Sequence, residues 1–198
     1  MSKELPVFFT LTGVQVNHYR VILADPPWNF LTRSGKGRDR CPDGQGHYDV
    51  MSLKDIKRLG TDVLQAAADD CVLLLWVTDP FLRHGLDVMQ CWGFEYKTIG
   101  FYWAKTGKSC SWPMGNGYWT RANPEQCLLG TIGNPKRVNK DVRKLIVSPR
   151  REHSRKPDEA IERIERLVDG PYLELFSRTS RPGWDSWGDQ IGKFDAEM

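Results

Sequence analysis

Long apolar runs, paired cysteines and clustered histidines are all missing from this sequence. No stretch approaches the roughly 20 apolar residues of a membrane-spanning helix, and the first residues, MSKELPVFFT, lack the cationic start and the cleavage site of a signal peptide. The five cysteines never fall at a Cys-x-x-Cys spacing, and the four histidines show no metal-binding spacing. These absences predict a cytoplasmic protein that has no membrane span, no disulfide framework and no metal site.

A strong charge of one sign is also absent. The net charge of +3 is common among soluble enzymes and does not by itself indicate a polyanionic partner. Basic residues nevertheless gather in three predicted loops, at 33–40, 136–144 and 150–156. One such cluster is typical of a solvated loop, whereas three in one domain favour a substrate that carries phosphates.

Short apolar runs alternate with segments of helical periodicity along the chain. Runs rich in β-branched and aromatic residues predict strands at 19–24, 71–78, 96–104, 125–132, 144–148 and 172–176. Apolar residues at helical spacing predict helices over 53–68, 79–93 and 156–170. Several of the strands are apolar throughout, which is typical of a parallel sheet covered on both faces. We therefore expect residues 1–198 to form a single α/β domain with a doubly wound, mainly parallel sheet, whose ligands bind beyond the carboxyl ends of the strands.

The stretch VILADPPWNF places an acid, two prolines and a tryptophan directly after the first predicted strand. A turn that ends a strand accounts for the acid and the prolines, but it does not need Trp28. Each proline keeps the residue before it extended, so the Asp25 carboxylate and the Pro26 carbonyl are held in defined directions. Two such acceptors match the two protons of an exocyclic amine, and the Trp28 indole can stack on the base that carries it.

This pair of acceptors has a chemical use. The amino group of adenine is a poor nucleophile because its lone pair is delocalised into the ring. Accepting both of its protons favours a pyramidal nitrogen whose lone pair is aimed at an electrophile. The stabilisation grows as positive charge develops on nitrogen, so it acts mainly on the transition state.

The segment DPPW after VILA resembles the signature of the adenine-N6 methyltransferases related to the catalytic subunit of the eukaryotic messenger-RNA adenosine methyltransferase, a family that has bacterial and phage members. Further segments are similar to this family in the same order, namely TRANPEQCLLGTIGNP (120–135), HSRKPDEAIERIERL (153–167) and LELFSRTSRPGWDSWGDQ (173–190). The resemblance extends from about Tyr19 to Gln190. It implies a Rossmann-like fold with a permuted motif order and S-adenosylmethionine as cofactor.

The resemblance also implies a set of site residues. The implied catalytic residues of the target-base pocket are Asp25, Pro26, Pro27 and Trp28, and the implied cofactor-binding residues are Asp25, Lys156, Arg178, Asp189 and Gln190. Lys156 would meet the cofactor carboxylate, Arg178 its ribose region and Gln190 its adenosine part. Glu125 occupies a position near the target nucleoside in relatives. From the residues alone, a solvated lysine at a helix start, a surface-paired arginine and a solvated strand-edge glutamate fit Lys156, Arg178 and Glu125 equally well.

Two departures from the family pattern concern the last segment. Asp189 stands where relatives often have asparagine, and an acid accepts hydrogen bonds from ribose hydroxyls but cannot donate one. The stretch TSRPGW resembles the bacterial branch of the family. Substrate contacts are further expected from Arg33 and Arg121, in the loops at 31–49 and 105–121, whose arginines reach either base edges or phosphates.

The expected function is therefore S-adenosylmethionine-dependent methylation of the N6 amine of adenine in nucleic acid. DNA is preferred because of the bacterial character of the last segment, and RNA is the alternative. A duplex target requires the base to leave the stack. A non-catalytic nucleic-acid-binding partner subunit and methylation of a small molecule or free nucleotide are further alternatives, and a homo- or hetero-oligomer stays open. The retention of Asp25, Trp28, Lys156 and Gln190 favours the enzyme.

Overall fold

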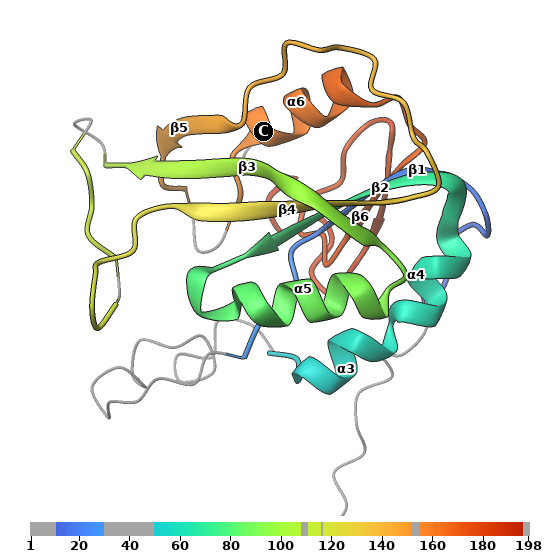
Figure 1. Ribbon diagram of the computed structural model, residues 1–198, viewed down its shortest axis with the longest axis horizontal. Coiled ribbons are helices and arrows are strands. Elements are labelled where there is room, and N and C mark those ends of the chain that lie inside the picture. Colours follow the sequence, from blue (N-terminus) through green and yellow to red (C-terminus); the bar gives the residue numbers. More distant parts are fainter. Residues whose placement is uncertain (1–10, 30–49, 108–110, 116, 152–154, 196–198) are drawn as a thin grey trace, which may run out of the picture.

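A twisted sheet runs through the centre of the protein, with helices on both of its faces (Figure 1). The computed structural model describes residues 11–29, 50–107, 111–115, 117–151 and 155–195. In these residues a seven-stranded sheet has the order β5-β3-β4-β2-β1-β6-β7. Its pairs are parallel except where β4 meets β2 and β3. The predicted Rossmann-like, mainly parallel sheet is confirmed.

The helices and strands follow the alternation expected from the sequence. In chain order they are β1 (Tyr19–Ala24), α3 (Leu53–Arg58), α4 (Gly60–Ala66), β2 (Ala67–Val77), the 3₁₀ turn η1 (Asp79–Phe81), α5 (Leu82–Cys91), β3 (Glu95–Thr106), β4 (Glu125–Ile132), β5 (Leu145–Pro149), α6 (Asp158–Leu167), β6 (Tyr172–Leu175) and β7 (Trp184–Trp187). No helix in these described parts of the chain is long and apolar enough to span a membrane.

Three elements differ from the sequence predictions. The helix predicted over 53–68 is divided at Leu59 into α3 and α4, and it ends at Ala66 because Ala67 already pairs with Tyr19 of β1. Strand β2 therefore begins before its apolar run. Strand β7 was not predicted, since its four residues have two polar side chains between two buried tryptophans rather than an apolar run.

The apolar strands are explained by a core on each face of the sheet. In β2, Leu73 and Leu75 belong to the core that also contains buried residues of α3, α4 and α5. Val72 and Leu74 alternate with them and belong to the core beneath α6. Because both faces are covered, every position in the strand interior is apolar and the period of two is lost. Figure 1 shows α5 and α6 on opposite sides of the sheet.

The strand directions bring several chain segments to one edge of the sheet. Strands β1, β2, β3 and β6 are parallel in direction, so their carboxyl ends lie at the same edge. Strand β4 runs the opposite way and begins there, at Glu125. The residues after β1 and β6 and the connection from β3 to β4 therefore converge, as the rule for open α/β sheets requires of a ligand site.

Helix α5 approaches the sheet closely at Gly85. A Cβ atom at this buried position would lie 2.4 Å from Cγ1 of Val77 and 3.2 Å from Cδ1 of Leu128. Only glycine fits between the helix and the sheet without displacing these side chains.

We expect Gly85→Ala to lower the free energy of unfolding by about 1–3 kcal/mol, because overpacking outweighs the better helix propensity of alanine. Urea denaturation measures the change. Gln90→Ala, at an exposed position of the same helix, is the control and should alter stability by less than about 0.5 kcal/mol. A Gly85→Ala protein as stable as the unmodified chain would contradict the close approach of α5.

Candidate active site

A cavity opens at this edge of the sheet and brings together most of the residues singled out in the sequence. It encloses about 690 Å³, including the solvent at its mouth. The lining residues are Asp25, Pro26, Pro27, Trp28, Trp76, Val77, Thr78, Glu125, Lys156, Phe176, Arg178, Asp189 and Gln190. Arg121 is exposed and does not line the cavity. Arg33 lies outside the described residues.

A chain of alternating charges crosses the cavity wall. The Lys156 Nζ lies 2.7 Å from Oδ2 of Asp25 and 3.3 Å from Oε2 of Glu125. The other carboxylate oxygen of Glu125 accepts a hydrogen bond from the ammonium of Lys105. Residues from the end of β1, the start of β4, the end of β3 and the approach to α6 are thereby joined. Lys105 was not predicted, because its role depends on the pairing of β3 with β4.

Burial and charge act in opposite directions on this network. Burial opposes ionisation of Glu125, but the Lys156 and Lys105 ammonium groups outweigh it and lower the pKa of Glu125 to about 2. Burial likewise disfavours the charged form of Lys156, yet the carboxylates of Asp25 and Glu125 raise its pKa above the ordinary lysine value. The Lys156 Nζ also lies 5.6 Å from the centroid of the Trp76 ring, which adds a cation–π contact.

The backbone after β1 forms a tight turn at the two prolines. The Trp28 amide donates to the Pro26 carbonyl at 2.8 Å, which closes a three-residue turn centred on Pro27. The Met51 amide donates to the Pro27 carbonyl at 2.9 Å and anchors the turn from outside. A carbonyl oxygen has two lone pairs, so the Pro26 oxygen retains one acceptor position.

Trp28 is held inside the wall of the cavity. Its side chain is 4% exposed, and its Nε1 donates to the Trp76 carbonyl at 3.1 Å. Its ring stacks on Phe81, with centroids 5.6 Å apart and an interplanar angle of 25°. The accessible area of the indole is therefore small, although Trp28 lines the cavity, and its stacking on a base stays a prediction.

The segment after β6 adds an aromatic side chain that the sequence analysis did not identify. Phe176 has a φ of 61°, a left-handed conformation that costs a non-glycine residue free energy and is typical of functional sites. Gly188 permits the chain to return beside it, since a Cβ there would lie 2.6 Å from the Ser177 carbonyl oxygen. This close passage places Asp189 and Gln190 next to Phe176 in the cavity wall.

A second, smaller cavity adjoins the first and shares with it the lining residues Asp25, Trp76, Lys156, Phe176 and Arg178. Its cover includes Phe194, whose amide donates to the Arg178 carbonyl at 3.2 Å. The Phe194 ring lies 5.4 Å from the Arg178 guanidinium and 5.3 Å from that of Arg155. Phe194 lies beyond the last recognisable segment, so no sequence signal identified it as a neighbour of the site.

Comparison with known proteins identifies the family. The sequence profile of the MT-A70 family matches residues 19–190. The chain belongs to the MT-A70 family. The type II methyltransferase M.MunI of a Mycoplasma species is 33% identical over 190 residues, which cover 87% of this chain and 78% of that protein.

Longer members of the MT-A70 family are nearly as similar. The N(6)-adenosine-methyltransferase MT-A70-like protein of Drosophila melanogaster is 33% identical over 87% of this chain and 27% of its own length. The human N(6)-adenosine-methyltransferase catalytic subunit METTL3 is 32% identical over 87% of this chain and 28% of its own length. The chain thus spans about a quarter of these two relatives. The family and the adenine-N6 methyltransferase class predicted from the sequence are confirmed.

Replacing Lys156, the central cation of the charge network, tests whether its charge acts on Glu125. In Lys156→Met we expect the pKa of Glu125 to rise from about 2, because Lys105 alone then opposes its burial. NMR titration of the Glu125 side-chain carboxyl measures this shift. An unchanged pKa would show that Lys156 is not near the carboxylate in solution.

The same variant changes the dependence of stability on pH. A carboxyl whose pKa is lower in the folded than in the unfolded state stabilises the fold above its unfolded pKa, and this stability is lost as pH falls toward the folded value. Breaking the pair should lower the free energy of unfolding by on the order of 3 kcal/mol at neutral pH. The fall in this free energy between about pH 4 and 2 should then be smaller than in the unmodified protein. Lys57→Met, which breaks a more exposed pair with Asp87, should cost less than about 1 kcal/mol.

Proposed function

We propose that this MT-A70 protein transfers a methyl group from S-adenosylmethionine to the exocyclic N6 amine of adenine in nucleic acid. The observation that carries the proposal is that Asp25 and Pro26 line one open cavity together, beside Trp28 and Lys156. Lys156 holds the carboxylate through its 2.7 Å contact, and the anchored turn at Pro27 holds the carbonyl.

The residues around the cavity fit the proposed cofactor. An amino-acid end needs a cation for its carboxylate and an acid for its amino group, which Lys156 and Asp25 supply. An adenosine end needs hydrogen-bonding side chains and an apolar surface, and Gln190, Asp189 and Phe176 provide them in the lining of the larger cavity. The guanidinium of Arg178, in the wall of both cavities, can donate hydrogen bonds to the hydroxyls of the sugar region. When bound, S-adenosylmethionine supplies a methyl group on a positively charged sulfur.

The chain itself prepares the amine for this transfer. The Asp25 carboxylate and the remaining lone pair of the Pro26 oxygen each accept one N–H of the amine. Losing conjugation with the ring costs free energy, which these hydrogen bonds offset as positive charge develops on nitrogen. Lys156 acts as a positioning residue, since its contacts with Asp25 and Glu125 fix the direction of the acceptor. The proton released from the methylated amine passes to solvent.

Trp28 contributes to this function as a wall of the base pocket. Its hydrogen bond to Trp76 and its stacking on Phe81 stiffen the turn that carries Pro26. A preorganised acceptor needs no rearrangement during the reaction, and such preorganisation is a large part of catalysis.

We propose DNA as the preferred substrate. The similarity to a type II methyltransferase covers most of both proteins, whereas the similarity to the N(6)-adenosine methyltransferases covers about a quarter of those chains. The bacterial character of the segment after Arg178 supports the same choice. RNA is the alternative because identity to the two groups is nearly equal.

Transfer of label from S-adenosylmethionine tests the proposal directly. The protein is incubated with adenine-containing DNA, with RNA of the same sequence and with free adenosine, and the products are digested and the methylated nucleoside is identified. We expect N6-methyladenine in DNA. Label in RNA alone would make RNA the substrate, whereas cofactor binding without any transfer would indicate a non-catalytic partner subunit.

The acceptor role of Asp25 makes a second prediction. Asp25→Ala should lower kcat by at least about 100-fold, because one acceptor for the amine is lost. Asp25→Asn keeps one oxygen acceptor without the charge and should retain more activity than the alanine variant. The dissociation constant for S-adenosylmethionine, measured by calorimetry, should change by less than about tenfold in the asparagine variant.

The control for Asp25 is Asp141→Ala, which removes a surface carboxylate paired with Arg166. Its kcat should equal that of the unmodified protein. Full activity in Asp25→Ala would refute the proposed role of the carboxylate.

A further inference from the structure

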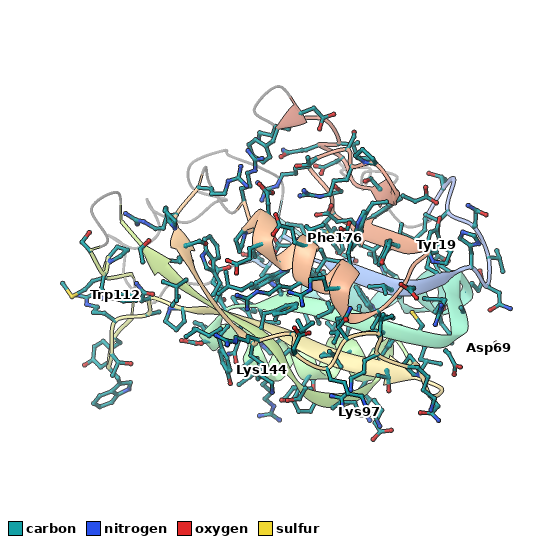
Figure 2. The ribbon with its side chains drawn as sticks, turned by 90° about the horizontal axis from the view of Figure 1, so that it is seen from above. Tyr19, Asp69, Lys97, Trp112, Lys144 and Phe176 are labelled. Atoms are coloured by element: carbon teal, nitrogen blue, oxygen red, sulfur yellow. The ribbon has the colours of Figure 1, made fainter. Side chains whose placement is uncertain are left out.

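The connection from β3 to β4 carries large side chains that are unusually exposed. The side chains that form this aromatic tip are Trp112, Met114, Tyr118 and Trp119, with exposed fractions of 64%, 80%, 93% and 92%. Single exposed apolar residues are normal, but a cluster of large ones indicates an interaction site. Figure 2 shows Trp112 standing away from the body of the protein.

The aromatic tip is tied to the charge network of the cavity by Asn123. The Asn123 side chain donates from Nδ2 to the carbonyls of Lys105 at 2.8 Å and Pro113 at 2.9 Å, and it accepts from the Lys105 amide at 3.0 Å. The Gly115 amide donates to the Ala122 carbonyl at 2.7 Å and joins the two sides of the connection. The base of the tip is therefore held in a defined position beside Lys105.

The tip and the cavity lie at the same edge of the sheet. The connection leaves the carboxyl end of β3 and enters β4 at Glu125, which lines the cavity and pairs with Lys105. A ligand that places one group in the cavity and continues along this edge therefore meets the tip. A polymer does so with the units next to the bound group, whereas a free nucleotide has no neighbouring unit that continues along the edge.

We propose that the aromatic tip stacks on nucleotides next to the adenine held in the cavity, an inference that rests on the proposed function. A base that leaves a stack uncovers the faces of its neighbours at a cost of a few kcal/mol. An aromatic ring placed against such a face recovers part of that cost, at about 1–3 kcal/mol per base. Tyr118 and Trp119 present their rings at right angles, with centroids 5.3 Å apart, so the pair offers two differently oriented faces.

The charges of the segment agree with a nucleic acid as occupant. Residues 111–121 include one cation, Arg121, and no acid. The exposed guanidinium of Arg121 provides a phosphate contact beside the stacking rings. The substrate contact expected of Arg121 is therefore assigned to the phosphate backbone next to the target base, outside the cavity.

Paired substitutions distinguish the effect of an aromatic ring from the effect of side-chain size. In Trp119→Leu and Tyr118→Leu the tip keeps an apolar side chain but loses a stacking face, so the affinity for a fluorescein-labelled adenine-containing DNA duplex should fall roughly five- to a hundredfold. Trp119→Phe keeps a ring and should stay within about threefold of the unmodified protein. Fluorescence anisotropy measures the affinities, and the RNA of the same sequence serves as the second probe.

Matched controls distinguish stacking from charge and from general damage. Tyr96→Leu replaces an exposed tyrosine at the other end of β3 and should leave the affinity unchanged. Arg121→Ala should reduce the slope of log affinity against log salt by about one, while the leucine variants should leave that slope unaltered. The affinity of all these variants for S-adenosylmethionine should match that of the unmodified protein.

Unchanged binding of both nucleic acids by the two leucine variants would overturn the inference. Sedimentation of the unmodified protein as a dimer that Trp119→Leu converts to a monomer would also overturn it, because the tip would then be an interface between copies. The proposed function fails separately, when the unmodified protein transfers no methyl group to either nucleic acid. In that case, weaker nucleic-acid binding by the leucine variants would still support stacking of the aromatic tip on nucleotides.

Discussion

The contact of one ammonium group with two carboxylates is the interaction on which the rest of the site depends. Lys156 joins Asp25 at the end of β1 to Glu125 at the start of β4. Each partner taken out of water alone would be costly, and the two carboxylates without a cation between them would repel each other. The network forms only when these segments are in their native places, so the order of the sheet also sets the direction of the Asp25 carboxylate.

One antiparallel strand determines what else reaches the cavity. Because β4 runs against its neighbours, it begins at the edge where β1, β2 and β6 end. Glu125 therefore enters the cavity, the Lys105 ammonium reaches it from the end of β3, and the connection between β3 and β4 lies at the same edge. If β4 were parallel to its neighbours, its carboxyl end would lie at the cavity edge. The connection from β3 would then enter β4 at the opposite edge of the sheet. The direction of β4 therefore places the proposed methyl-transfer site and the proposed nucleic-acid contact of the aromatic tip at the same edge of the sheet.

The aromatic residues show how a local pattern is reinterpreted by packing. Trp28 stands beside the two acceptors in the sequence and was expected to present its ring to a base, but Phe81 and the Trp76 carbonyl hold that ring in the wall. Phe176 and Phe194, which carry no local signal, face the cavities instead. Proximity along the chain identifies which residues share a turn, whereas the side-chain direction depends on neighbours that come from distant segments.

The sequence by itself determined the α/β class and most of the strands, because buried strands covered on both faces must be apolar throughout, and it indicated the family through the resemblance of DPPW and three later segments in the same order. It also identified Asp25, Lys156, Arg178 and Gln190 as residues of one site. Only the tertiary structure decided that Lys105 and Lys156 share Glu125, that β7 completes the sheet, and that Phe194 covers Arg178. These are contacts between segments remote in sequence, and their energies depend on burial and strand direction, which no local pattern of residues encodes.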